Sequence, residues 1–261
     1  MRLKIKAGKS RFTLPIITDF VIPQVGKGDL LMHTPRAGFL EMLDFASQAC
    51  KKELFNYTGS VLFTSEHAVG TDGARMVVAC GAGPVTKDIL IPLPVIQALK
   101  TLEGEKVTIA ESPSDLCFQT PQASIVARKL AKTFPNFDSI IPKTFKSKHK
   151  ISAPQMLAGI KRISPLLSED DKRILLTFSA ESLIISVSNN SGSAEDVIDA
   201  EQIEPDPAFD ILPDHRYSID SGALLDFYGA VNGDTIICGN GPANPVWIEA
   251  GNKKLLCSSK G

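Results

Sequence analysis

The sequence has no run of about 18 uncharged apolar residues, which is the length that a transmembrane helix requires. Its basic N-terminus leads into an alternating pattern and lacks the apolar core of a signal peptide. Both absences favour a cytoplasmic chain that does not contact a membrane.

Cysteine is sparse, and the familiar catalytic signatures are missing. The five cysteines are odd in number and include no CxxC pair, which favours reduced, packed thiols over a zinc site. No G-x-x-x-x-G-K-S/T, H-E-x-x-H or G-x-S-x-G motif occurs. We therefore expect no metal, no cofactor and no catalytic residue.

Excess positive charge is also lacking, because 28 Lys and Arg residues face 29 Asp and Glu residues. A net charge of −1 argues against a protein that grips nucleic acid by bulk charge, although it allows one that only surrounds it. The composition is 43% hydrophobic and 22% charged, as in ordinary globular proteins. A chain of 261 residues fits two domains of about 100–150 residues each.

The same order of patterns occurs on each side of residues 134–142. Apolar residues at helical spacing predict helices over 39–50 and 94–102 on one side, and helices from 153 and from 221 on the other. Strand patterns lie between and after them, at 30–32, 60–64, 75–79, 88–91, 106–110, 116–120 and 124–128, and at 174–179, 183–188, 194–200, 216–219, 235–238, 246–249 and 254–257. This repeat predicts a duplicated α+β domain.

Two further segments frame the repeat. Residues 1–18 alternate as a hairpin would around Gly8, and a lone hairpin must dock to be stable. Residues 16–23 follow as an extended connector. The run Phe134–Pro142 has one proline at its second position and another at its end, and it suits a stiff connector between domains. A buried edge strand is the alternative interpretation of those nine residues.

Five segments together resemble the bacterial DNA sliding clamp, the beta subunit of DNA polymerase III. They are KAGKSRFTL (6–14), GTDGARMV (70–77), FPNFDSIIP (134–142), LIISVSNN (183–190) and the last strand, which ends in Leu255 and Leu256. The family has three domains, and the resemblance begins in the last hairpin of the first. It implies a remnant hairpin over 1–25, a clamp domain over 26–142 and a second clamp domain over 143–261.

The resemblance implies tandem DNA-clamp domains of the α+β class, each with two helices packed on antiparallel sheets, the helices lining a ring. Such a ring is a non-catalytic processivity factor of DNA replication, which encircles duplex DNA and tethers DNA polymerase and the clamp loader through short peptide motifs. Two-domain chains reach six domains as a homo-oligomer closed head to tail, a trimer. A shortened form with an unpaired front is the alternative.

The resemblance also places a hydrophobic peptide-binding pocket at the turn around Asp72 and at the connector. From the residues alone, Asp72 and Gly73 indicate a plain tight turn. Carried over position by position, the pocket comprises Thr71, Gly73, Arg75, Met76, Pro135, Ile140, Ala243, Pro245, Leu255, Leu256 and Cys257. Ala74, Ser139 and Ala223 depart from the family pattern, which predicts a pocket of different shape.

Basic residues on or beside the predicted helices are the candidates for DNA contact. They are Arg36, Lys51, Lys52, Lys100, Lys161 and Arg162. Singly, each is explained as an ordinary solvated charge, whereas together they suit weak, salt-sensitive attraction to phosphates. Two alternatives to the sliding clamp stay open: a clamp-derived peptide-binding module that does not encircle DNA, and a small-molecule enzyme on a duplicated α+β scaffold.

Overall fold

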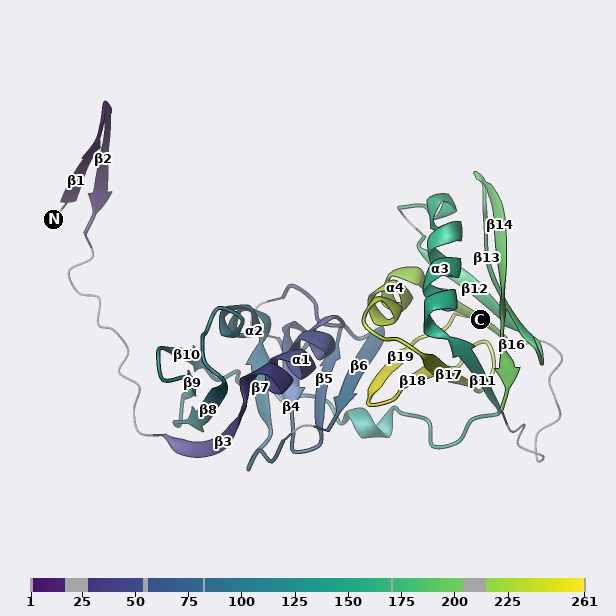
Figure 1. Ribbon diagram of the computed structural model, residues 1–261, viewed down its shortest axis with the longest axis horizontal. Coiled ribbons are helices and arrows are strands. Elements are labelled where there is room, and N and C mark those ends of the chain that lie inside the picture. The colour runs from purple at the N-terminus through teal and green to yellow at the C-terminus, as the bar shows by residue number, and fades with distance from the viewer. Residues whose placement is uncertain are drawn as a thin grey trace.

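In the computed structural model, which describes residues 2–16, 28–53, 56–81, 83–169, 171–203 and 215–260, two halves of the chain contain the same series of elements (Figure 1). The first half consists of β3 (Asp29–Pro35), α1 (Arg36–Ser47), β4 (Ser60–Phe63), β5 (His67–Thr71), β6 (Arg75–Cys80), β7 (Ile89–Pro92), α2 (Leu93–Leu99), β8 (Lys106–Glu111), β9 (Asp115–Gln119) and β10 (Ser124–Arg128). The second half consists of β11 (Ser147–Ser152), α3 (Ala153–Ile163), β12 (Arg173–Phe178), β13 (Ser182–Asn189), β14 (Gly192–Asp199), β15 (Glu201–Gln202), β16 (His215–Asp220), α4 (Ser221–Gly229), β17 (Asp234–Gly239), β18 (Val246–Ala250) and β19 (Lys253–Cys257).

The sheets of the two halves correspond strand for strand. Strands in the order β10-β9-β8-β3 and β6-β5-β4-β7 form the first half, and strands in the order β19-β18-β17-β11 and β14-β13-β12-β16 form the second. Only β15 lacks a counterpart among the described strands. The predicted α+β fold with a duplicated unit is confirmed.

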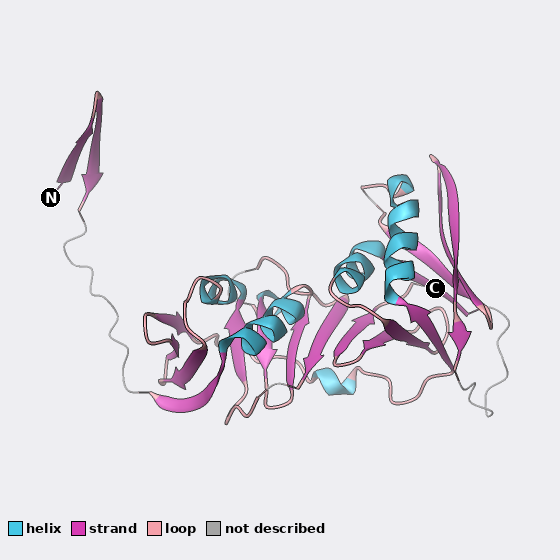
Figure 2. Cartoon of the chain, in the orientation of Figure 1, coloured by secondary structure: helices cyan, strands magenta, loops and turns pink. Residues whose placement is uncertain are grey.

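The halves meet where β6 pairs with β19. The two strands are antiparallel, with Met76 opposite Leu256 and Val77 opposite Leu255. This pairing joins one sheet from each half into a sheet of nine strands, which runs through the molecule in Figure 2. Beside it, the rings of Phe45 in α1 and Phe227 in α4 are 5.9 Å apart, so the junction is apolar on its helix side as well.

All four α-helices lie on the same side of the nine-stranded sheet (Figure 1). Helix α3 shows why they fit closely: Met156, Ile160 and Ile163 are buried, while Lys161 and Arg162 face outward. Gly159 faces β13 and β14, where a Cβ atom would lie 2.6 Å from Ile185 Cδ1. A larger residue there would require the side chains of Ile185 and Asp196 to move.

The opposite face of the nine-stranded sheet is covered by the connector. Phe137, in a 3-10 turn (Phe137–Ser139), packs in an apolar cluster with Leu62, Met76 and Trp247 of the sheet. The prediction of a connector is therefore confirmed, and the alternative of an edge strand is wrong, because residues 134–142 pair with no strand in the described chain.

Three strands escaped the sequence patterns: β5, β11 and the two-residue β15. In β11, Ser147, His149 and Ile151 are buried and Lys148 and Lys150 are half-exposed, so the alternation is regular but its buried positions are polar. Strand β5 was missed because it is short and contains Gly70, which lies so close to Ala46 that a Cβ atom would be 2.0 Å from the carbonyl oxygen.

The remaining predicted elements agree with the structure to within a few residues. Helix α1 begins at Arg36, three residues before the predicted start, and α2 ends at Leu99, before the predicted end at Leu102. All but the first residue of the predicted connector over 16–23 lies outside the described residues.

The N-terminal hairpin is confirmed, and it has an uncovered apolar face. Strands β1 (Arg2–Ala7) and β2 (Ser10–Pro15) place Leu3 opposite Leu14 and Ile5 opposite Phe12. These four side chains are between 41% and 52% exposed. The hairpin therefore buries little apolar surface of its own, as expected for two strands without a third.

The described cysteines are free, and burial raises the pKa of Cys238 and of Cys257 to about 12. These are neutral, packed thiols, as the sequence predicts. None of the helices in the described ranges is both long and apolar enough to cross a membrane.

A buried histidine pair lies in the second half. His149 is 3% exposed, stacks on Phe178 with ring centroids 4.5 Å apart, and lies 6.4 Å from the ring of His215. Burial, together with the charge of His215, lowers the pKa of His149 to about 4. Burial and the nearby Lys146 also lower the pKa of His215. The folded state therefore favours the neutral form of both imidazole rings.

We predict that stability falls as the pH falls from about 6.5 to 4. In that window the unfolded chain binds more protons at these histidines than the folded chain does, so protonation favours unfolding. Between pH 7 and pH 5, His149 alone accounts for about 2 kcal/mol of unfolding free energy. His149→Phe should reduce the difference between urea titrations at the two pH values by that amount. Replacing the exposed His33 by Phe is the control, and an equal reduction there would contradict the assignment.

Candidate functional site

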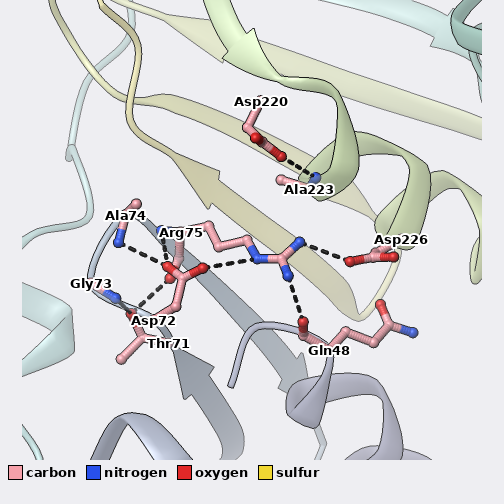
Figure 3. A network of polar contacts seen from close by, with 9 residues as sticks. All are labelled: Gln48, Thr71, Asp72, Gly73, Ala74, Arg75, Asp220, Ala223 and Asp226. Atoms are coloured by element: carbon pink, nitrogen blue, oxygen red, sulfur yellow. Dashed lines mark hydrogen bonds and ion pairs between the residues drawn. The ribbon is translucent and has the colours of Figure 1, made fainter. Parts of the chain in front are cut away.

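The turn between β5 and β6 is fixed by two side chains (Figure 3). Asp72 Oδ1 accepts the N–H groups of Ala74 and Arg75, each at 2.8 Å. The Thr71 hydroxyl donates to the carbonyl of Arg75 at 2.7 Å and accepts the N–H of Gly73 at 3.1 Å. Gly73 has a φ of 92°, which glycine adopts without strain. The tight turn indicated by the sequence is confirmed.

Arg75 extends from this turn across the junction between the halves (Figure 3). Its Nη1 lies 2.9 Å from Asp226 Oδ2 in α4, and its Nη2 donates to the carbonyl of Gln48, just after α1, at 2.9 Å. Its Nε lies 3.3 Å from Asp72 Oδ2. Charge-assisted bonds of this kind are stronger than neutral ones, so Arg75 ties the turn to both halves.

A cavity of about 190 Å³ lies beside this network. Its lining comes from the turn, from the start of α4 and from the end of β19: Asp72, Ala74, Arg75, Asp220, Ala223, Cys257 and Ser258. Asp220 caps α4, since its Oδ1 accepts the N–H of Ala223 at 3.0 Å. Two carboxylates, one guanidinium and two alanines thus form a small, polar recess.

The predicted pocket residues are only partly brought together. Arg75 and Cys257 line the recess, Thr71 holds the turn, and Gly73 is exposed at its tip. Met76, Leu255 and Leu256 are between 0% and 6% exposed and form the floor of the junction. Their side chains belong to the core rather than to an open surface.

The connector residues lie at a second opening. A cavity of about 400 Å³ runs between the connector and the sheet, lined by Pro135 with Leu62, Leu90, Phe134 and Phe137 among others. Ile140 is 54% exposed on the connector. Ala243 is exposed and Pro245 half-buried in the turn before β18.

Sequence reasoning missed several residues of the recess. Asp220 lines the recess, and Asp226 and Gln48 bind Arg75 beside it. The two aspartates come from the second half, which the β6–β19 pairing places beside the turn, whereas Gln48 follows α1 in the same half as Arg75. One signal was available for Asp220, because an aspartate just before the helix predicted from residue 221 is a typical N-cap. In the part of the chain that is described, no group of three or more His, Cys, Asp and Glu side chains could hold a metal ion.

The six predicted DNA-facing cations divide into two sets. Three have protein partners: Arg36 Nη2 donates to the carbonyls of Leu99 and Lys100, Lys100 pairs with Asp44 at 2.5 Å, and Arg162 pairs with Asp196 at 2.6 Å. The other three, Lys51, Lys52 and Lys161, are exposed and have no ion pair within the described ranges.

Comparison with known proteins gives one family name throughout. No family model matches the chain. It is 23% identical over 251 residues to the beta sliding clamp of Caulobacter vibrioides, which covers 89% of this chain and 65% of that protein. It is 24% identical over 203 residues to the beta sliding clamp of Pseudomonas putida, covering 72% of this chain and 55% of that protein. The chain therefore spans less than two thirds of the length of these curated relatives.

Solved structures give the fold. The DNA polymerase III subunit beta of Pseudomonas aeruginosa matches all of this chain with a TM-score of 0.84 at 18% identity, over 75% of its own length. The beta sliding clamp of Caulobacter crescentus matches it with a TM-score of 0.83 at 20% identity, over 74% of its length. A P. aeruginosa sliding clamp bound to griselimycin also matches, with a TM-score of 0.82 at 18% identity, over 73% of its length. The chain has the clamp fold, and the resemblance seen in the sequence is confirmed.

We predict that Arg75→Ala lowers the free energy of unfolding by about 2 kcal/mol, because charge-assisted bonds to both halves are lost together. Urea titration measures the change. Arg173→Ala is the matched control, since Arg173 lies 3.9 Å from Asp171 in a surface pair and should cost at most about 0.5 kcal/mol. Equal losses in the two variants would contradict a junction role for Arg75.

Proposed function

We propose that this protein is a DNA sliding clamp, a non-catalytic processivity factor of replication that acts in the cytoplasm and encircles duplex DNA. The proposal depends on one observation: four helices lie along the same side of a continuous sheet, in a chain that matches solved sliding clamps along its whole length (Figure 1). We assign residues 26–142 and 143–261 as its two clamp domains and residues 1–25 as a remnant hairpin.

A ring of six such domains requires three copies of this chain, joined head to tail. The junction between the two halves is itself a head-to-tail contact, because β6 of one unit pairs with the last strand of the next. A chain of units joined in this way has a different sheet edge at each of its two ends. Repetition of a heterologous contact closes a ring when the rotation permits it.

The charges of the helix side support weak DNA binding. Lys51, Lys52 and Lys161 are exposed, while Arg36, Lys100 and Arg162 are engaged by protein groups. Each phosphate contact adds affinity for DNA that is lost as the salt concentration rises. A surface with few such contacts therefore binds DNA loosely and without sequence preference. A ring that encircles DNA stays on it without a higher binding affinity.

We further propose that short peptides of DNA polymerase and of the clamp loader bind beside the β5–β6 turn. Of the predicted pocket residues, Arg75 and Cys257 line the recess and Pro135 lines the opening at the connector. The recess is small and contains Asp72 and Asp220, so it suits a short or polar side chain, and the connector opening suits an apolar one.

The first test of the proposal is retention on circular DNA. Chains dispersed at high salt are returned to low salt with a nicked circular duplex and then passed through a sizing column at moderate salt. A clamp stays with the circle despite the salt and elutes freely once a restriction enzyme cuts the circle. Equal behaviour on circular and linear DNA contradicts encirclement, and retained peptide binding in that case identifies a clamp-derived interaction module.

We predict that Ala74→Phe weakens peptide binding at least tenfold, because Ala74 lines the recess and is exposed, so a larger ring fills the space without disturbing the core. Calorimetry with a synthetic peptide copied from the clamp-binding segment of a bacterial replicative polymerase measures the change. Ala180→Phe, at an exposed alanine in the turn between β12 and β13, is the matched control. Unchanged affinity in Ala74→Phe, or equal loss in both variants, would place the peptide elsewhere.

A further inference from the structure

The sequence contains the dipeptide Asn-Gly twice, at residues 232–233 and 240–241. The first copy lies between α4 and β17, and the second follows β17. In this dipeptide the backbone nitrogen of glycine can attack the asparagine side-chain amide with little obstruction, because glycine has no Cβ. The two copies share this intrinsic chemistry, so any difference in their reactivity comes from the fold around them.

The side-chain amide of Asn240 is held at both of its polar atoms. Its Oδ1 accepts the N–H of Lys146 at 2.8 Å, and its Nδ2 donates to the carbonyl of Thr144 at 2.9 Å. The backbone is held as well, because the carbonyl of Asn240 accepts Asn244 Nδ2 at 3.2 Å and the carbonyl of Gly241 accepts the N–H of Asn244 at 3.0 Å. Attack by the Gly241 nitrogen would break these hydrogen bonds, so it requires local opening of the turn.

The side-chain amide of Asn232 has no such partner. Asn232 is exposed, and its side chain makes no hydrogen bond to any residue in the described part of the chain. Gly233 is exposed too, has a φ of 78°, and has no atom beyond its chain neighbours within 4 Å of the position that a Cβ would take. Within the described ranges its N–H donates no backbone hydrogen bond. The Asn232 side chain can therefore turn toward the Gly233 nitrogen without breaking a contact.

We propose that Asn232 is a site of spontaneous deamidation in the folded protein, and that Asn240 is protected from it. The backbone nitrogen of Gly233 loses its proton and attacks Cγ of Asn232, the new C–N bond closes a cyclic succinimide, and the side-chain nitrogen leaves as ammonia. Water, the only co-reactant, then adds to one of the two ring carbonyls and opens the ring. Opening at Cγ gives aspartate, and opening at the main-chain carbonyl gives isoaspartate, whose backbone runs through Cγ. The inference does not depend on the proposed function.

The site lies beside the start of α3, so the two products differ in their structural effect. The carbonyl of Gly233 accepts the N–H of Ala153, the first residue of α3, at 2.8 Å. Aspartate leaves the main chain unchanged and keeps this hydrogen bond. Isoaspartate inserts one carbon into the main chain before Gly233 and displaces its carbonyl, so the first N–H of α3 loses its acceptor. Deamidation by that route loosens the N-terminal turn of α3.

The equivalent hydrogen bond in the first half has no labile residue beside it. There the N–H of Arg36, the first residue of α1, donates to the carbonyl of Glu105 at 2.8 Å. The residue before Glu105 is Gly104, which has no side-chain amide to lose. The first half thus makes this contact at its helix start without asparagine, which confines the effect of deamidation to α3.

Ageing of the folded chain in mildly alkaline buffer tests the proposal. A protease that cleaves before aspartate separates the two sites, because Asp234 lies between them, and mass spectrometry then follows each peptide. Conversion at Asn232 should be about tenfold faster or more than at Asn240, because Asn240 reacts only from locally opened molecules. In concentrated urea, where both turns are unfolded, the two rates should become similar. Equal rates in the folded protein, or no conversion at Asn232, would overturn the proposal.

Hydrogen exchange tests the effect on α3. The same protease cuts before aspartate but not before isoaspartate, so it reports how much of each product has formed. In aged protein, the fraction that carries isoaspartate should exchange the N–H of Ala153 faster than fresh protein does. Asn232→Gln is the control, because glutamine would have to close a larger and less favoured ring, and after ageing it should remain unconverted and exchange as fresh protein does. Unchanged exchange in the isoaspartate fraction would overturn the link to α3.

Discussion

The antiparallel pairing of β6 with β19 is the contact on which the rest of the structure depends. It joins two sheets from separate halves into one, and it fixes their register through Met76 with Leu256 and Val77 with Leu255. Because both halves have the same topology, one such contact is enough to place all four helices on the same side. The connector then covers the other side, where Phe137 packs on the cluster to which Met76 and Leu256 belong. The layered arrangement that the function needs is thus a consequence of a single strand pairing.

The candidate site is formed by the same strand pairing. The β5–β6 turn, the start of α4 and the end of β19 meet only because β6 and β19 are neighbours, and Arg75 reaches Asp226 across that boundary while it also binds the carbonyl of Gln48 in its own half. The recess therefore exists only in a chain whose two halves are docked. A peptide that binds there contacts both halves at once and favours the docked state by mass action. The proposed peptide binding and the integrity of the junction are coupled for this physical reason.

The sequence predicted the elements well wherever burial and hydrophobicity coincide. It failed at β11, where Ser147 and His149 occupy buried positions and are held by neighbours far away in the chain, such as Tyr217, whose hydroxyl lies 3.3 Å from Ser147 Oγ. For the site, the family resemblance indicated the β5–β6 turn and strand β19, which form it. The sequence positions of the apolar residues could not show that Met76 and Leu255 face the core. Nor could it show that Lys100 and Arg162 have acidic partners, since Asp44 and Asp196 are 56 and 34 residues away. Long-range pairing of this kind has no local signal.

Those ion pairs bear on how a protein of net charge −1 can work on DNA. The guanidinium of Arg162 is held by Asp196 and the ammonium of Lys100 by Asp44, so these two positive charges on the helix side each have a negative charge beside them. The field that the helices present to a phosphate backbone is therefore small, and at physiological salt it decays within about 8 Å. Such a surface gains little by holding any one phosphate and loses little by releasing it. In the proposed clamp, retention on DNA comes from closure of the ring, which makes the strength of the contacts between copies, rather than the affinity for DNA, the quantity that sets how long the protein stays bound.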